Sequence, residues 1–387
     1  MKILAICQAL DLSLKSFGIT PAWWQILKGF SEVGVEVVAV PFVGRSVETP
    51  WWRTYQNPNL YKYLIYATCE KLLLRLGVYK NAMDFRQKNQ RLLNYLVRSL
   101  AMKKWRSFLR KLVQNERDLD AAILFTVPLN FFTGLAKMLR EHLNIPVIFY
   151  DGDTPTSLPK YGGLSLSFYN GADVSEYDGF IVNSKGVVDE LREMGANKVY
   201  TVYWGVDPSF FSPLQDIERD IDVSFYGVGS KGREYWITEM LSKPSKMLEK
   251  YRFAVEGSGF DLDLGRVITY EGVPYRNFCC RSNICLNITR KGHAEVYGSS
   301  NSRIFELASM GCCIVSNPWR GIEEWFSVGK EVLVVSGMEE AVEVYEWLLS
   351  NPEERRKLGE AALKRLLKEH TVRHRVDQML NIIKELS

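Results

Sequence analysis

A glutamate stands inside an apolar stretch of the sequence SSNSRIFELASMG, which runs from Ser299 to Gly311. The apolar residues of its second half recur at helical spacing, so we expect a buried helix from Ile304 onward. The good helix caps, Asn301 and Ser302, come too early for Glu306 to complete a capping box. Glu306 therefore reaches solvent, pairs with the arginine three residues before it, or binds a ligand.

The loop before this helix is rich in groups that bind anions. It leaves the predicted strand ICLNIT, and its sequence continues as RKGHAEVYGSSNS. Helix N-termini attract phosphate, because free backbone N–H groups and the helix dipole favour an anion there. Glu306 would then accept hydrogen bonds from a ribose diol. The loop residues that we expect to meet a diphosphate or a sugar are Arg290, Ser300, Asn301, Ser302 and Arg303.

A glycine loop, FYGVGSKGREYW, follows another predicted strand and precedes a helix. Gly227, Gly229 and Gly232 form a G-x-G-x-x-G pattern, which is weak alone but has the right context here. With Glu256 as a ribose contact it would bind a dinucleotide. Two cations in the loop favour instead a diphosphate leaving group whose charge must be neutralised. A tight turn with solvated cations is the structural alternative. The two cations are Lys231 and Arg233.

Two aspartates follow the predicted strand at 146–150, in the sequence YDGDTP. Asp151 and Asp153 could bind a divalent metal that carries a nucleotide diphosphate, because hard cations prefer oxygen ligands. One of them could instead serve as a base or as a contact for acceptor hydroxyls. An Asx turn before Pro155 is the structural alternative.

Other chemistries find little support in the composition. The net charge is +4, and no zinc-finger, RNP-like or basic-zipper spacing occurs, so nucleic acid is not an expected partner. The seven cysteines form no C-x-x-C motif, and several lie in strand-like stretches, which predicts reduced, buried thiols in a cytosolic protein. No zinc-ligand spacing and no nucleophile elbow appears.

Short apolar strands alternate with amphipathic helices in two successive series, which is typical of parallel sheets. The first series comprises 2–7, 35–42, 121–127, 146–150 and 179–184. The second comprises 221–227, 252–257, 267–272, 284–289, 312–316 and 331–336. We therefore expect an α/β protein with two Rossmann-like domains, at residues 1–210 and 211–370, joined by a proline-containing and charged linker at 208–220.

Residues 86–115 carry nine Lys or Arg and no acidic residue, with leucines at near-helical spacing. A surface helix with one buried face is the simpler interpretation. An amphipathic helix on an anionic membrane surface is the functional one. This helix falls within a basic helical insertion at about 50–118.

The start MKILAIC is too short and too weakly charged for a signal peptide, and no apolar stretch reaches the length of a membrane span. We therefore expect a cytoplasmic location, with the inner face of the membrane as an alternative if the basic helix binds lipid.

These residues together resemble a known group of enzymes. The stretch GFIVNSKGVVDELREMGANKVYTVYWGVDPSFFSP, followed by LNITR, SNSRIFELASMGCCIVSN, GIEEWF and EHTVRHR, is similar to the group 1 glycosyltransferases of two-Rossmann (GT-B) architecture. The YDGDTP segment is similar to one found in the spore-maturation-protein-like branch. The likeness covers most of residues 145–387, whereas nothing is recognised over 45–120.

The resemblance implies a nucleotide-sugar donor on the C-terminal domain, an acceptor on the N-terminal domain and catalysis in the cleft between them. Glu306 would hold the donor ribose, Arg290 and the 299–303 loop would contact the diphosphate or sugar, and Asp151 or Asp153 would face the acceptor. A final helix over 371–387 would cross back to the first domain. Many relatives carry a second glutamate eight positions before the first, but Gly298 stands there in this chain. The resemblance therefore allows the retaining stereochemistry of those relatives and leaves the choice between a retaining and an inverting outcome open.

The sequence-based hypothesis is a metal-independent glycosyltransferase without a cofactor, which uses a nucleotide diphosphate sugar and a hydroxyl acceptor. The acceptor could be a glycan, a lipid-linked molecule or a small molecule. Three alternatives have the same architecture: an NAD-dependent oxidoreductase built on the glycine loop, a nucleotide-sugar epimerase, and a catalytically silent membrane-associated binding protein.

Overall fold

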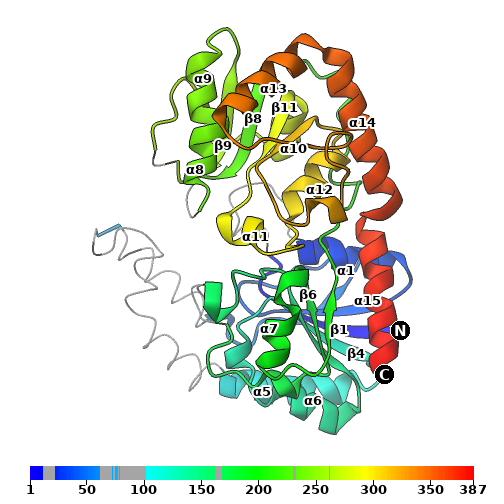
Figure 1. Ribbon diagram of the computed structural model, residues 1–387. Helices are drawn as coiled ribbons and strands as arrows, with labels where there is room; N and C mark the ends of the chain where they lie inside the picture. The colour runs from blue at the N-terminus through cyan, green and yellow to red at the C-terminus, as the bar shows by residue number, and fades with distance from the viewer. Residues whose placement is uncertain are drawn as a thin grey trace.

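The computed structural model describes residues 1–11, 22–61, 72, 75–76, 78, 102–161, 168–229, 232–260 and 262–387. These residues form two α/β units that lie one above the other, each built on a parallel sheet (Figure 1). The strand order in the first sheet is β3-β2-β1-β4-β5-β6-β7, and in the second it is β10-β9-β8-β11-β12-β13. The predicted α/β class with two parallel sheets is therefore confirmed.

The first sheet belongs to the N-terminal domain. Its central strands are buried along their whole length, as expected for a parallel sheet covered on both faces. β3 and β7 are short additions at its two edges that the sequence patterns did not predict. The strands are β1 (Lys2–Cys7), β2 (Glu36–Pro41), β3 (Arg53–Thr54), β4 (Ala121–Phe125), β5 (Val147–Asp151), β6 (Gly179–Val182) and β7 (Val199–Thr201).

The second sheet belongs to the C-terminal domain, and every strand pair in it is parallel. β8 lies at its centre between β9 and β11, so the loops that follow these strands open at the same edge. The strands are β8 (Ile221–Val228), β9 (Phe253–Ser258), β10 (Ile268–Tyr270), β11 (Ser282–Asn287), β12 (Ile314–Ser316) and β13 (Leu333–Val334).

Helices cover both sheets (Figure 1). In the N-terminal domain they are α1 (Ala22–Glu32), α5 (Met102–Asn115), α6 (Leu135–Leu143) and α7 (Val188–Glu193). In the C-terminal domain they are α8 (Glu234–Ile237), a π-helical turn (Thr238–Ser242), α9 (Lys243–Met247), α10 (Tyr275–Cys280), α11 (Lys291–Glu295), α12 (Ser302–Ser309), α13 (Met338–Ser350) and α14 (Pro352–Glu369). Short 3₁₀ turns lie at Leu129–Phe131, Pro159–Tyr161, Val174–Glu176, Lys185–Val187 and Ile322–Glu324.

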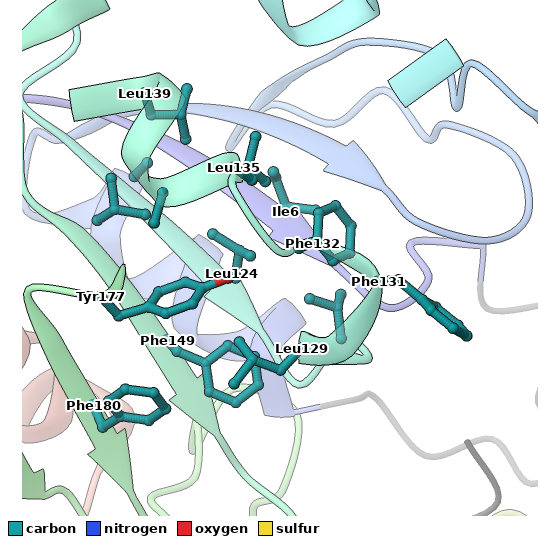
Figure 2. Close-up of a cluster of buried hydrophobic side chains, with 14 of the residues drawn as sticks. Ile6, Leu124, Leu129, Phe131, Phe132, Leu135, Leu139, Phe149, Tyr177 and Phe180 are labelled. Carbon is teal, nitrogen blue, oxygen red and sulfur yellow. The ribbon is translucent and has the colours of Figure 1, made fainter. Parts of the chain in front are cut away.

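Aromatic side chains fill one face of the first sheet. Phe149 from β5 and Phe180 from β6 lie side by side with ring centroids 5.6 Å apart. Tyr177 packs against both, and Leu124 from β4 extends the cluster toward Phe132 (Figure 2). This packing holds β4, β5 and β6 together, and the loops that follow β5 and β6 belong to the candidate site.

The last helix, α15 (Val372–Leu386), leaves the C-terminal domain and packs on α1 of the N-terminal domain (Figure 1). Val376, Met379 and Ile383 are buried in the same apolar cluster as the first sheet. A Cβ added at Gly29 would lie 3.0 Å from Val376 Cγ2, so the two helices approach closely. The predicted crossing back of the final helix is confirmed.

The basic segment is described only in part, because residues 86–101 lie outside the described residues. Over the described part, the apolar side chains of α5 face inward, and Trp105, Leu109 and Leu112 are buried in the core of the N-terminal domain. The apolar face of α5 is therefore covered by protein and is not available to lipid. No helix in the described part of the chain is long and apolar enough to span a membrane.

Candidate functional site

Helix α12 begins at Ser302, two residues earlier than the apolar pattern predicted. The side chain of Asn301 caps it by accepting a hydrogen bond from the backbone N–H of Ile304. Glu306 lies beyond the first turn and is 4% exposed. Burial raises the pKa of its carboxyl, and Arg303, Ser302 and Tyr275 oppose that shift. The expectation that Glu306 is not part of a capping box is thus consistent with the position of the cap.

Two arginines share one backbone carbonyl beside this helix. Arg233 Nε and Arg303 Nη1 donate to Ile288 O at 3.0 and 3.2 Å. Arg233 is 8% exposed, and burial together with the neighbouring charges of Arg303 and Arg290 lowers its pKa to about 8. Two guanidinium groups held this close, in a buried place, stabilise an anion that binds between them.

Arg290 is the third cation of this cluster and forms the N-cap position of α11. Its guanidinium has no hydrogen-bond or ion-pair partner among the described residues, and its Nε is buried. Burial and the charge of Arg303 lower its pKa, whereas Asp153 raises it. A half-buried cation that makes no hydrogen bond or ion pair is costly, so an anionic ligand would stabilise this arrangement. We call Arg233, Arg290 and Arg303 the arginine cluster.

The glycines of the glycine loop leave room for neighbouring side chains. Gly227 lies within β8, and a Cβ there would come 2.4 Å from Arg303 Nη2, so the glycine lets this arginine lie against the strand. Gly229 is buried, and a Cβ there would meet Phe260 at 2.4 Å. The carbonyl of Gly232 accepts the backbone N–H of Lys291 at 2.9 Å, which joins the loop to α11. Lys231 lies outside the described residues.

The dinucleotide alternative requires Glu256 as a ribose ligand, but its carboxylate binds backbone groups of the protein instead. Its carboxylate accepts the backbone N–H groups of Gly272 and Val273 at 3.3 and 3.2 Å, and the residue is 5% exposed. It therefore anchors the loop after β10. This argues against Glu256 as a ribose ligand.

The two aspartates of the N-terminal domain differ sharply. Asp151 is fully buried and accepts hydrogen bonds from the hydroxyls of Ser157 and Tyr169, both at 2.6 Å, and from the N–H of Asp153 at 3.0 Å. Burial raises the pKa of Asp151 to about 6, against the effect of those hydroxyls. Asp151 thus shapes the loop and does not face a ligand, contrary to its expected catalytic role. Asp153 is half-buried and acts electrostatically on Arg290 across the domain boundary.

The side chains of Ser300 and Asn301 also form hydrogen bonds within the protein. Ser300 is fully buried, donates its hydroxyl to Asn183 O at 3.0 Å and accepts the N–H of Trp204 at 3.0 Å. Asn301 caps α12 and donates to Thr289 Oγ1 at 2.6 Å. Their side chains are therefore not free for the predicted diphosphate contact. Ser302 is half-buried at the start of α12.

Sequence reasoning did not give a role to His293, which the structure places beside the arginine cluster. It is 8% exposed, and its Nδ1 lies 2.9 Å from Ser299 Oγ. Burial, followed by the charges of Arg290 and Arg233, lowers its pKa to about 3. The sequence did place His293 in the loop between Arg290 and Arg303, the two arginines predicted to bind an anion, and this position could have indicated a role near the ligand. No group of three or more metal-ligating side chains with suitable geometry is found among the described residues.

Comparison with known proteins agrees with this architecture. Residues 233–381 match the family model described as glycosyl transferase-like, and this stretch contains the whole arginine cluster and Glu306. No curated protein sequence matches the chain.

Several solved structures match along their whole length. Sucrose-phosphate synthase from Thermosynechococcus elongatus has a TM-score of 0.64 at 13% identity, covering 100% of this chain and 99% of its own. Anabaena HepE in complex with UDP and glucose has a TM-score of 0.63 at 11% identity, with 99% coverage of both chains. TarM has a TM-score of 0.65 at 11% identity, covering 99% of this chain and 98% of its own.

The two-sheet architecture is the GT-B fold of glycosyltransferases, and residues 233–381 are similar to the glycosyl transferase-like family. The similarity to the spore-maturation-protein-like branch stays a prediction.

Proposed function

We propose that this protein transfers a sugar from a nucleotide diphosphate sugar to a hydroxyl acceptor, in the cleft between its two domains. The observation that carries the proposal is the arginine cluster. It lies within the glycosyl transferase-like region, and Arg290 has no hydrogen-bond or ion-pair partner among the described residues. A diphosphate supplies the negative charge that such a cluster lacks.

The chemistry requires that the bond between the anomeric carbon and the diphosphate oxygen breaks while charge develops on that oxygen. The guanidinium groups of the arginine cluster would stabilise this charge, and the free N–H groups at the start of α12 would add to it. In this proposal the three guanidinium groups supply the positive charge, so the reaction needs no metal ion and no cofactor. Glu306, buried beside Arg303, would accept hydrogen bonds from the ribose hydroxyls.

The acceptor would enter from the N-terminal domain. There, the half-buried carboxylate of Asp153 raises the pKa of Arg290. We propose that Asp153 orients the acceptor hydroxyl or accepts its proton. HepE is known in complexes with UDP and with UDP-glucose, so these are the first donor ligands to test. A glycan and a lipid-linked molecule are both acceptors of the proposed kind.

We also propose that α5 contacts an anionic membrane surface, but through its polar face. Residues 102–115 contain five cations and no acidic residue, although the net charge of the whole chain is only +4. All five are exposed, and none forms an ion pair with a described residue. Each would contribute about 1 kcal/mol to binding an anionic surface. The five residues are Lys103, Lys104, Arg106, Arg110 and Lys111, which we call the α5 cations.

Apolar residues in the same insertion favour a membrane over a nucleic acid as the partner of the α5 cations. Leu72, Leu76 and Val78 are 56%, 66% and 55% exposed, and Tyr61 is 79% exposed. Such side chains gain from entering a lipid interface and gain little from a phosphate backbone. The proposed location is therefore the cytoplasmic face of a membrane.

The enzymatic proposal is tested by incubating the purified protein with UDP-glucose and other nucleotide sugars, with and without candidate acceptors, and measuring release of the nucleoside diphosphate. Release that depends on acceptor and is lost in Glu306→Ala supports the proposal. Conversion of donor to another nucleotide sugar without acceptor would instead support an epimerase. Binding without turnover would support the silent binding protein, and binding of NAD alone would support an oxidoreductase.

A further inference from the structure

The two domains pair through their backbones next to the candidate site. Residues 183–186 follow β6 of the N-terminal domain, and residues 297–300 precede α12 of the C-terminal domain. Ser184 and Ser299 form an antiparallel bridge. Around it, Lys185 N donates to Gly298 O at 3.1 Å, Gly186 N to Tyr297 O at 2.9 Å, and Ser300 N to Asn183 O at 2.9 Å. We call these two segments the interdomain clamp.

Glycines allow the segments to approach this closely. A Cβ at Gly186 would lie 2.7 Å from Val296 Cγ1 and 3.1 Å from the backbone of Tyr297. Gly298 has a φ of +57°, which disfavours other residues, and a Cβ there would lie 3.0 Å from the hydroxyl of Tyr203. Gly321 packs behind it, where a Cβ would meet Gly298 N at 2.4 Å.

An ion pair strengthens the clamp at one end. Lys185 Nζ lies 2.7 Å from a carboxylate oxygen of Glu324, which belongs to the C-terminal domain. Glu324 also accepts the hydroxyls of Tyr297 at 2.7 Å and Tyr203 at 3.3 Å. These donors hold its pKa below the usual range, Lys185 contributing most. Polar contacts thus join both domains at the same place as the backbone pairing.

The clamp also holds the two loops that carry the opposed charges of the site. On one side, the Asn183 side chain donates to Gly152 O at 3.1 Å and accepts the hydroxyl of Thr154, which fixes the turn around Asp153. On the other side, Ser299 contacts His293, three residues after Arg290 on the same short helix. Asp153 and Arg290 are therefore attached to opposite strands of one hydrogen-bonded unit.

We propose that the interdomain clamp positions Asp153 against Arg290, so that the acceptor side and the donor side of the cleft are held in register during transfer. The inference rests on the proposed function. Gly186 and Ser299 act as positioning residues, because they touch neither the proposed donor nor the proposed acceptor. Gly298 occupies the position eight residues before Glu306, and in this chain that position serves the clamp.

The test compares Gly186→Ala with Gly292→Ala. The first variant inserts a methyl group between the clamp segments, whereas a Cβ at Gly292, in α11 beside Arg290, meets nothing within 4 Å. We expect Gly186→Ala to lower kcat by about 100-fold, since a small misplacement of reacting groups has effects of this size. Its affinity for UDP should change less than about threefold, because the donor contacts lie in the other domain. Gly292→Ala should match the wild type.

Amide hydrogen exchange supplies a readout that does not depend on turnover. Residues 183–186 and 297–300 should be protected in the wild type and exchange faster in Gly186→Ala. Ser299→Ala keeps the backbone pairing and removes the contacts of the hydroxyl to His293 and to Thr154 O, so it should lower kcat by about tenfold at unchanged protection.

Faster exchange without loss of kcat, or no protection of these amides in the wild type, would overturn the clamp. If the wild type bound no nucleoside diphosphate and had no turnover, the proposed function would fail. The exchange data alone would then decide whether the clamp forms in solution.

Discussion

Arg290→Met should stabilise the protein without ligand and weaken nucleotide binding at the same time. Arg290 has no hydrogen-bond or ion-pair partner among the described residues, and it raises the electrostatic cost of Arg233 and Arg303 nearby. Methionine keeps the length of the side chain and removes the charge. The substitution therefore separates the effect of the Arg290 charge on the stability of the unliganded protein from its effect on the affinity for the proposed ligand.

The expected magnitude follows from the partial burial of this charge. Leaving a buried polar or charged group unpaired costs about 1–3 kcal/mol, and loss of the favourable effect of Asp153 offsets part of the gain. A net gain of about 2 kcal/mol raises the melting temperature of a domain of this size by about 4–8 °C. Loss of a charge-assisted hydrogen bond to a diphosphate, worth about 1.5–3 kcal/mol, weakens UDP binding by about 10- to 150-fold.

Thermal unfolding and isothermal titration calorimetry with UDP measure both effects on the same sample. Lys291→Met is the matched control, because Lys291 is the next residue, is exposed and, within the described part of the chain, forms an ion pair only with Glu295, at 3.8 Å. Its stability should change by less than about 0.5 kcal/mol and its UDP affinity hardly at all. A destabilised Arg290→Met with unchanged UDP affinity would show that Arg290 has a structural role and would refute the reasoning.

Three further outcomes are expected. Asp153→Asn should lower kcat by at least about 100-fold with little effect on UDP affinity, because the carboxylate acts on the acceptor and not on the donor; equal kcat in variant and wild type would exclude this role. His293 is buried as the neutral form, with a folded pKa of about 3 against an ordinary 6.5, so its contribution to stability is present above pH 6.5 and is lost as the pH falls toward 3. As the pH falls through that window, the unfolding free energy of the wild type should decrease by about 1.4 kcal/mol more per pH unit than that of His293→Gln. Parallel curves for the two proteins would contradict a buried, neutral His293. A variant with four of the α5 cations replaced by glutamate (Lys103, Lys104, Arg110 and Lys111) should no longer sediment with phosphatidylglycerol vesicles at low salt. A control variant with glutamate at Arg45, Lys330, Lys364 and Lys384 should still sediment. Vesicle binding by the first variant, or equal binding of the wild type to DNA, would refute a lipid surface as the partner.

The fold follows from local signals that parallel sheets display clearly. Buried parallel strands appear as short apolar runs, and those centred on β1, β5 and β8 were predicted to within a residue or two. β3 and β7 escaped prediction because edge strands of two or three half-exposed residues have no apolar pattern of their own. The crossing of α15 could be expected only from the family resemblance, since its partner α1 is more than 300 residues away in sequence.

The site was predicted unevenly, and the reason is burial. The arginines and Glu306 could be proposed from the sequence because charged residues in apolar or glycine-rich surroundings are unusual whatever the fold. Asp151 and Ser300 have residue types that often bind ligands, yet their partners Tyr169 and Asn183 come from distant parts of the chain. Only the tertiary structure shows that these two side chains are already satisfied.

The interdomain clamp could not be predicted for the same reason. Gly186 and Gly298 look like ordinary loop glycines, and nothing in either local sequence indicates that they lie in segments of two domains that pair with each other. The sequence shows that position 298 lacks a glutamate, but only the structure shows that a Cβ there would lie 3.0 Å from the Tyr203 hydroxyl and 3.3 Å from Lys185 Cβ.

The central claim is that the arginine cluster and Glu306 bind a nucleotide diphosphate. Calorimetric titration of the wild type with UDP, GDP, ADP, the matching monophosphates and NAD tests it most directly. We predict saturable binding of one nucleoside diphosphate, much weaker binding of its monophosphate, and loss of affinity in both Arg290→Met and Glu306→Ala. Equal binding of all nucleotides, binding of NAD alone, or unchanged affinity in both variants would contradict the account.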